Sequence, residues 1–201
     1  MRKLFVSAIL FMACSTAMSQ TFMHGVGLSI MGGYTDAGDF TIAGGYTYSP
    51  RINFVETEKL SVSAGIPLSM GVTSTSNFEY DAYSGYTNEY SIDFVANVPF
   101  IVNLNMGRGS TKENRQKFGY FVGGGYGFHH GSFYGFYPDE LDPTYERLGS
   151  RNLNIHGPAA NAGMRFGVGK KHKNIELRFS FMKGINESKP NIFGIAGLFN
   201  F

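Results

Sequence analysis

The segment that decides the fold is the last one, Asn191-Ile-Phe-Gly-Ile-Ala-Gly-Leu-Phe-Asn-Phe201. Large apolar residues occupy alternate positions of this segment, namely Phe193, Ile195, Phe199 and Phe201. Only Gly197 interrupts the alternation. A repeat of two residues is typical of a β-strand that has one face in an apolar medium. We therefore expect a C-terminal strand with one face against a core or a membrane.

The N-terminal segment is typical of a secretory signal peptide. Arg2 and Lys3 give it a positive start, an apolar run covers Leu4–Ala13, and Ala17-Met18-Ser19 has the small-x-small form of a cleavage site. The apolar run is too short to cross a bilayer as a helix. We expect residues 1–19 to be a removed signal peptide and residues 20–201 to form one domain.

The composition of the remaining chain excludes several classes of protein. The single cysteine, Cys14, lies in the signal segment, so residues 20–201 contain no disulfide or reactive thiol. An acylated Cys14 is disfavoured because Phe11 stands where lipoproteins carry leucine. Two of the 17 basic residues also lie in that segment, which leaves 15 against 15 acids. A net charge near zero argues against a nucleic-acid partner.

Alternation of apolar and polar residues divides the mature chain into eight segments. They are Phe22–Gly32, Asp39–Val55, Leu60–Thr73, Tyr90–Asn105, Phe118–His129, Leu153–Gly169, Asn174–Lys183 and Asn191–Phe201. Their length suits strands of about ten residues that are tilted across a bilayer. Short basic connections alternate with longer polar ones. These patterns predict an all-β fold, an eight-stranded up-and-down antiparallel transmembrane β-barrel. Pro67 and Pro99 lie inside predicted strands, where we expect β-bulges.

The charges inside the predicted strands indicate which face meets lipid. Four of them lie on the phase opposite the large apolar residues, namely Asp93, Arg165, Glu176 and Arg178. A basic residue that faces lipid at mid-depth costs about 2–4 kcal/mol. The apolar phase should therefore point outward, and these four side chains should form an interior salt-bridge network with Asn and Ser neighbours.

Two soluble folds are the alternatives. A lipocalin-type barrel needs an apolar interior and a charged exterior, and usually carries terminal helices and a disulfide. A β-sandwich would have to bury every large apolar side chain in one core. The even spread of apolar residues over all eight segments disfavours both.

The pattern resembles the small outer-membrane β-barrels of the OmpA/OmpX type, the outer membrane β-barrel or porin family of Gram-negative bacteria. The signal segment, eight strands, short basic turns, longer loops and terminal Phe201 carry the resemblance. It implies a place in the outer membrane, contact with membrane lipid and lipopolysaccharide, and a monomer. It also implies that Ile195, Phe199 and Phe201 form a C-terminal signal for the barrel assembly machinery.

Two groups of polar residues suggest chemistry, and both are weak. His130 and Ser132, with Glu140, loosely match a barrel lipid A deacylase, but Asn does not follow the serine. His129 and His130, with Asp139 or Asp142, lack chelating geometry because adjacent strand residues point to opposite faces. We expect no catalytic, cofactor or metal site.

The function that these observations favour is structural or surface-interactive and non-catalytic. The outward loops are rich in acids and in tyrosine, a residue that gives contact area at low entropic cost, as at Tyr80, Tyr83 and Tyr86. A lipid-modifying enzyme and a small passive pore are the alternatives. An eight-stranded barrel leaves no wide channel.

Overall fold

The computed structural model describes residues 21–81, 85–138, 146–169, 172–185 and 189–201. The expected signal peptide and the acids Asp139, Glu140 and Asp142 lie outside the described residues. The strands are β1 (Thr21–Tyr34), β2 (Phe40–Glu56), β3 (Leu60–Gly65), β4 (Leu68–Asp81), β5 (Gly85–Gly107), β6 (Phe118–Pro138), β7 (Glu146–Gly167), β8 (Asn174–Lys183) and β9 (Asn191–Asn200). Within the described ranges, no helix is long and apolar enough to cross a membrane.

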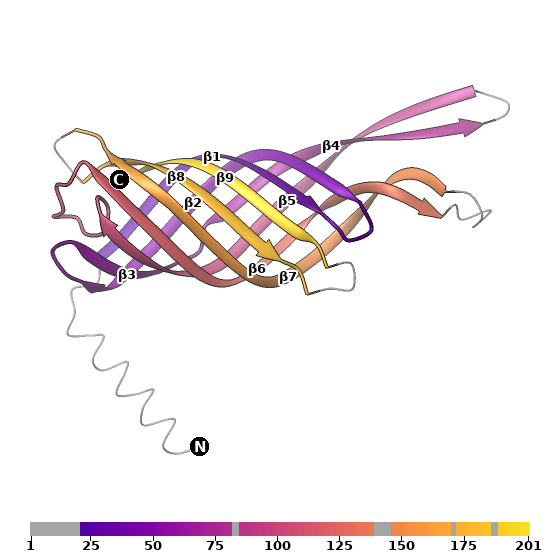
Figure 1. The fold of residues 1–201 in the computed structure, drawn as a ribbon. Coiled ribbons are helices and arrows are strands. Elements are labelled where there is room, and N and C mark those ends of the chain that lie inside the picture. Colours follow the sequence, from indigo (N-terminus) through magenta and orange to yellow (C-terminus); the bar gives the residue numbers. More distant parts are fainter. Residues whose placement is uncertain (1–20, 82–84, 139–145, 170–171, 186–188) are drawn as a thin grey trace, which may run out of the picture.

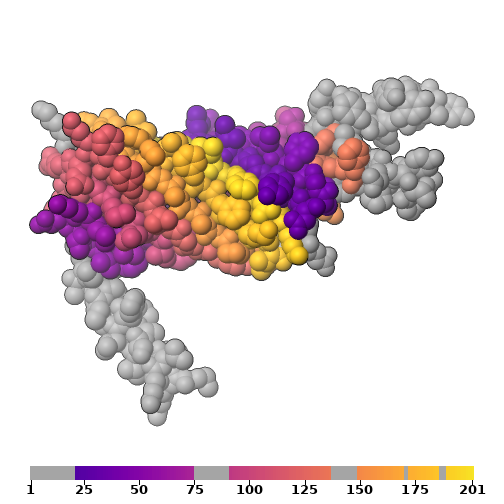
Figure 2. Space-filling view, viewed as in Figure 1, coloured from indigo at the N-terminus to yellow at the C-terminus, as the bar shows by residue number. Residues whose placement is uncertain are grey.

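The strands close into a ring in which every neighbouring pair is antiparallel (Figure 1). Each strand pairs with the next along the chain except β3 and β4, which both pair with β2 and β5, and β9 pairs with β1 through partners such as Leu28 and Gly197. The first and last strands lie side by side on the visible surface, in indigo and yellow (Figure 2). β3 and β4 share one position in the ring, because both lie between β2 and β5. The barrel therefore has eight strand positions, which we call staves and number along the chain. The predicted eight-stranded barrel is confirmed.

The third stave is interrupted at Ile66 and Pro67, which separate β3 from β4. The pairing of Gly65 with Ile101 and of Ser69 with Asn97 keeps one register and sets Pro67 opposite Pro99. No residue is inserted, so the expected bulges at the two prolines are wrong. The Ile66 N–H donates to the Pro50 carbonyl on β2 (3.2 Å), which turns the Pro67 backbone toward β5. Neither facing proline has an N–H, so two ladder bonds are missing there.

The outer face of the barrel is apolar around the whole ring. On β2, Ile42 is 66% exposed whereas its neighbour Thr41 is 5% exposed, and on β5 Ile92 is 76% exposed. Every strand except β3, whose Leu60 and Val62 are half-buried, adds large exposed apolar side chains to this face. A soluble monomer exposes apolar patches of only a few hundred Å². The wall is therefore built to lie in hydrocarbon, with its polar residues inside.

Two hairpins project from one end of the barrel, opposite the C-terminus (Figure 1). The β4–β5 hairpin stays paired to Asp81 and Gly85, and the β6–β7 hairpin to Pro138 and Glu146. β4 leaves β2 at Val72 and β5 leaves β6 at Ala96, so beyond these residues the two strands of the β4–β5 hairpin pair only with each other. The expected loops 74–89 and 130–152 are therefore largely strand.

Candidate functional site

The barrel interior holds an ionic cluster centred on Glu176 of β8, which is completely buried. Its Oε2 accepts hydrogen bonds from Arg165 Nε (2.7 Å) and Arg51 Nη1 (3.4 Å). Its Oε1 accepts from Arg178 Nε (2.9 Å) and also from Nη2 of the same arginine. Direct pairing of Arg165 with Glu176 across β7 and β8 brings the central ion pair together.

Neutral groups hold the cluster in place. Asn105 Oδ1 accepts from Arg165 Nη1 (2.9 Å), and Ser49 Oγ accepts from Arg178 Nη2 (2.9 Å). Asn200 Nδ2 donates to Glu176 Oε2 (3.1 Å), and the Phe121 ring lies 4.3 Å from the Arg165 guanidinium. Charged hydrogen bonds and a cation–π contact are strong where water is excluded, so the arginines have little freedom to move.

Three of the four predicted network residues meet in this cluster, and the fourth does not. Asp93 lies on β5 near the projecting hairpin, opposite Thr73, where its carboxylate is 3.5 Å from the Ser91 hydroxyl. The expectation that Asp93 joins the network is therefore wrong, because it lies several residue levels toward the hairpins. Sequence reasoning missed Arg51, although its odd position in β2 put it on the inward phase.

The β5–β6 turn folds back into the barrel and closes the end that carries the C-terminus. The carbonyl of Gly109 accepts hydrogen bonds from Arg51 (3.1 Å) and Arg165 (3.4 Å). The Ser110 carbonyl accepts from Asn53 Nδ2 (2.7 Å), and Ser110 is completely buried. Gly109 has φ +74°, a conformation that favours glycine. Burial lowers the pKa of Arg108, which donates to the Lys173 carbonyl (2.9 Å).

The opposite end of the interior is apolar, in contrast to the polar interior expected from the sequence. One buried cluster consists of Ile101, Phe133, Ile155, Ala159, Met182 and Ile192, and a second of Met31, Ala43 and Val95. The β6–β7 hairpin reaches across to β2, where Tyr134 pairs with Phe40. An ion pair joins Arg151 of β7 to Asp39, the residue before β2 (3.8 Å). Side chains therefore fill the mouth below the hairpins.

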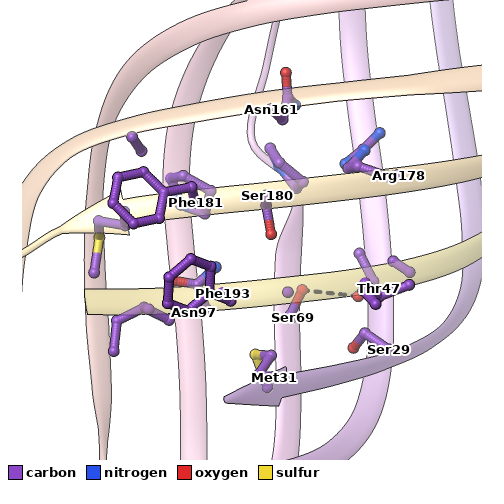
Figure 3. Close-up of a pocket in the computed structure, with 18 of the residues that line it drawn as sticks. Ser29, Met31, Thr47, Ser69, Asn97, Asn161, Arg178, Ser180, Phe181 and Phe193 are labelled. Carbon is purple, nitrogen blue, oxygen red and sulfur yellow. Dashed lines mark hydrogen bonds between the residues drawn. The ribbon is translucent and has the colours of Figure 1, made fainter. Parts of the chain in front are cut away.

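A small chamber lies between the ionic cluster and this apolar cap (Figure 3). Its volume is about 30 Å³. Its polar lining consists of Ser29, Thr47, Ser69, Asn97, Asn161, Arg178 and Ser180. Thr47 and Ser69 bond to each other through their hydroxyls (2.7 Å). The chamber is the interior space to which the polar and apolar halves of the barrel both contribute.

Of the residues considered for catalysis and metal binding, the structure describes His129, His130 and Ser132. His130 Nδ1 lies 2.8 Å from Asn154 Oδ1, and the Ser132 hydroxyl donates to Asn152 Oδ1 (2.7 Å). Each partner is thus an amide, so no serine–histidine hydrogen bond is formed. His129 points inward and is completely buried, whereas His130 is on the outer face. The described parts of the chain contain no group of three metal-ligating side chains.

The C-terminal residues lie on the strand that completes the ring. Ile195 and Phe199 point outward from β9 and are exposed. The Phe201 N–H donates to the His24 carbonyl (3.1 Å), and the two rings are 4.2 Å apart. These contacts fix the last residues against β1. Recognition of Ile195, Phe199 and Phe201 by assembly machinery stays a prediction.

Comparison with known proteins identifies the fold. No protein-family model and no curated protein matches the sequence. Among solved structures, Ail, the attachment invasion locus protein of Yersinia pestis, superposes with a TM-score of 0.53 and 11% identity, covering 92% of this chain and 100% of that one. Neisserial surface protein A superposes with a TM-score of 0.50 and 7% identity, covering 91% and 98% of the two chains.

Proposed function

The chain has the fold of the small bacterial outer-membrane β-barrels, and on that premise we propose that it is a non-catalytic surface-interaction protein in the outer membrane of a Gram-negative bacterium. In this proposal it is a monomer that enters through a cleaved signal peptide and is assembled through β9. The apolar outer face of its barrel contacts lipid and lipopolysaccharide. The projecting hairpins contact a partner outside the cell.

The observation that carries this proposal is the contrast between a filled barrel and its long hairpins. The β5–β6 turn fills one end of the interior and the apolar clusters fill the other. The β4–β5 hairpin remains paired far beyond the wall. A paired hairpin is ordered before it binds, so less conformational entropy is lost on contact. The arrangement favours display over conduction.

The composition of the β4–β5 hairpin indicates the kind of partner. Residues 74–95 contain four acids and no Lys, Arg or His. Four tyrosines accompany them, at positions 80, 83, 86 and 90. Tyrosine supplies contact area, and the acids attract a cationic surface. Ail has been crystallised with the heparin analogue sucrose octasulfate, whereas the charge of this hairpin disfavours a sulfated ligand.

Attachment of bacteria that display the protein tests this proposal. Cells that display the unchanged chain should adhere to a polylysine-coated surface more strongly than cells without the protein, and less to a heparin-coated surface. Replacing Tyr80, Tyr83 and Tyr86 with serine should reduce adhesion at least about tenfold, because tyrosines are frequent hot spots of binding. The control is Tyr120→Ser, on the outer wall near the other end. Equal adhesion by folded triple-variant and unchanged cells would refute the proposed role.

A further inference from the structure

Polar side chains around the interior chamber lack partners although they are buried. Asn161 is 4% exposed, and neither atom of its amide group has a hydrogen-bond partner among the described residues. The same holds for Arg178 Nη1 and Ser29 Oγ, whose residues are 5% and 6% exposed. All three residues line the chamber, and Figure 3 shows Asn161 and Arg178 on neighbouring strands. Buried polar groups are normally satisfied, so a bound species is expected here.

The charge beside the chamber is unbalanced. Arg51, Arg165 and Arg178 surround the single carboxylate of Glu176, which leaves two positive charges in the cluster. Glu56 lies at the rim, where it accepts a hydrogen bond from Asn53 (2.8 Å). Asp93 lies near the hairpins at the other end. A buried excess of positive charge is costly in a low-dielectric wall, and an anion reduces that cost.

We propose that the chamber binds one small monovalent inorganic anion of the chloride class, held by Arg178 Nη1 and the Asn161 amide. A space of about 30 Å³ accommodates roughly two water-sized species. It therefore admits a halide and excludes phosphate or an organic carboxylate. Water alone would satisfy the hydrogen bonds but would offset neither of the two excess positive charges, whereas the anion offsets one of them. The anion is thus a structural component of the barrel, independent of what the hairpins bind.

The dependence of stability on the salt tests the proposal. The purified protein in detergent micelles is unfolded with urea in sodium chloride and in sodium gluconate at equal ionic strength. Chloride should stabilise the folded state, and above saturation the folding equilibrium constant should rise about tenfold per tenfold increase in chloride. Gluconate is too large for the chamber. Equal stability in the two salts would overturn the proposal.

A substitution that supplies its own negative charge gives a second test. Asn161→Asp places a carboxylate where the anion is proposed, so stability should no longer depend on chloride. Asn154→Asp makes the same change on the exposed outer face of β7 and should keep that dependence. Should Asn161→Asp fail to fold, crystals of the unchanged protein grown in bromide decide the question. An anomalous peak beside Arg178 Nη1 is expected, and its absence refutes the site.

Discussion

At the scale of single residues, Glu176 determines whether the interior is stable. One carboxylate accepts hydrogen bonds from three buried arginines. Removal of one member of a buried ion cluster costs more than the cluster contributes, because it leaves uncompensated charge. The site therefore tolerates change poorly.

Glu176→Gln should lower the free energy of unfolding by about 3–5 kcal/mol, because it removes the carboxylate that three buried arginines share. Asp93→Asn, a matched acid outside the cluster, should cost about 1 kcal/mol or less. Urea unfolding in micelles, followed by circular dichroism, measures both. Equal losses of unfolding free energy in the two variants would show that the cluster does not contribute more to stability than an acid outside it.

The sequence predicted three members of this cluster because charges on the inward phase of strands are easily recognised. It could not separate Asp93 from them, since alternation gives the face of a residue but not its height in the barrel. The height of a residue depends on the register between neighbouring strands. That register is known only from the structure, which sets Arg165 opposite Glu176. Arg51 carried the same inward-phase signal.

At the scale of elements, the seam between β1 and β9 relies on close approach of the two backbones. Gly27 pairs with Leu198, and a Cβ at Gly27 would overlap the carbonyl of Gly197. On the outer face of β2, a Cβ at Gly44 would meet nothing. Close backbone contact therefore requires glycine at position 27 but not at position 44, although both residues lie inside strands.

Gly27→Ala should destabilise the barrel by about 1–3 kcal/mol, because the seam must widen to admit the methyl group. Gly44→Ala should be neutral or slightly stabilising, since alanine has less backbone freedom to lose. Gel mobility of unboiled samples heated in steps reports how readily each barrel opens. A Gly27→Ala barrel that opens no earlier than Gly44→Ala would contradict this account of the seam.

Alternation predicted the membrane-spanning parts of the strands and missed their extensions. Within the wall, one face meets hydrocarbon and the other the interior, which imposes a period of two. Beyond the wall, both faces of the β4–β5 hairpin are outside hydrocarbon, so its Ser, Thr, Asn and Tyr residues show no such contrast. The lengths of β5 and β6 were therefore underestimated.

At the scale of the whole molecule, the barrel is a filled cylinder. The turn that bears Gly109 occupies one end, and Phe133 with its apolar neighbours occupies the other. The sequence predicted the absence of a wide channel from the strand number alone. It did not predict that the loop-side interior is apolar, because Met31, Ile155 and Ile192 share a phase with polar residues elsewhere.

Reconstituted protein should give no ion conductance above the background of a planar bilayer, because both ends are occupied by packed side chains. A large porin reconstituted in the same membrane is the positive control. Insertion is checked independently by protease protection and by gel mobility of unboiled samples. Discrete conductance steps from the inserted, folded barrel would revive the passive-pore alternative.

Pro67 and Pro99, which face each other on the third and fourth staves, weaken the hydrogen bonding of the barrel wall at one level. Pro67 and Pro99 remove two cross-links at one level, and Pro50 removes the reciprocal bond to Ile66 on the adjoining stave. The β2–β3 ladder also shifts register between Asn53 and Val55, whereas the β1–β9 junction, where the chain's two ends meet, keeps one register throughout. Local opening of the wall should therefore start between β2, β4 and β5 rather than at the junction of β1 and β9.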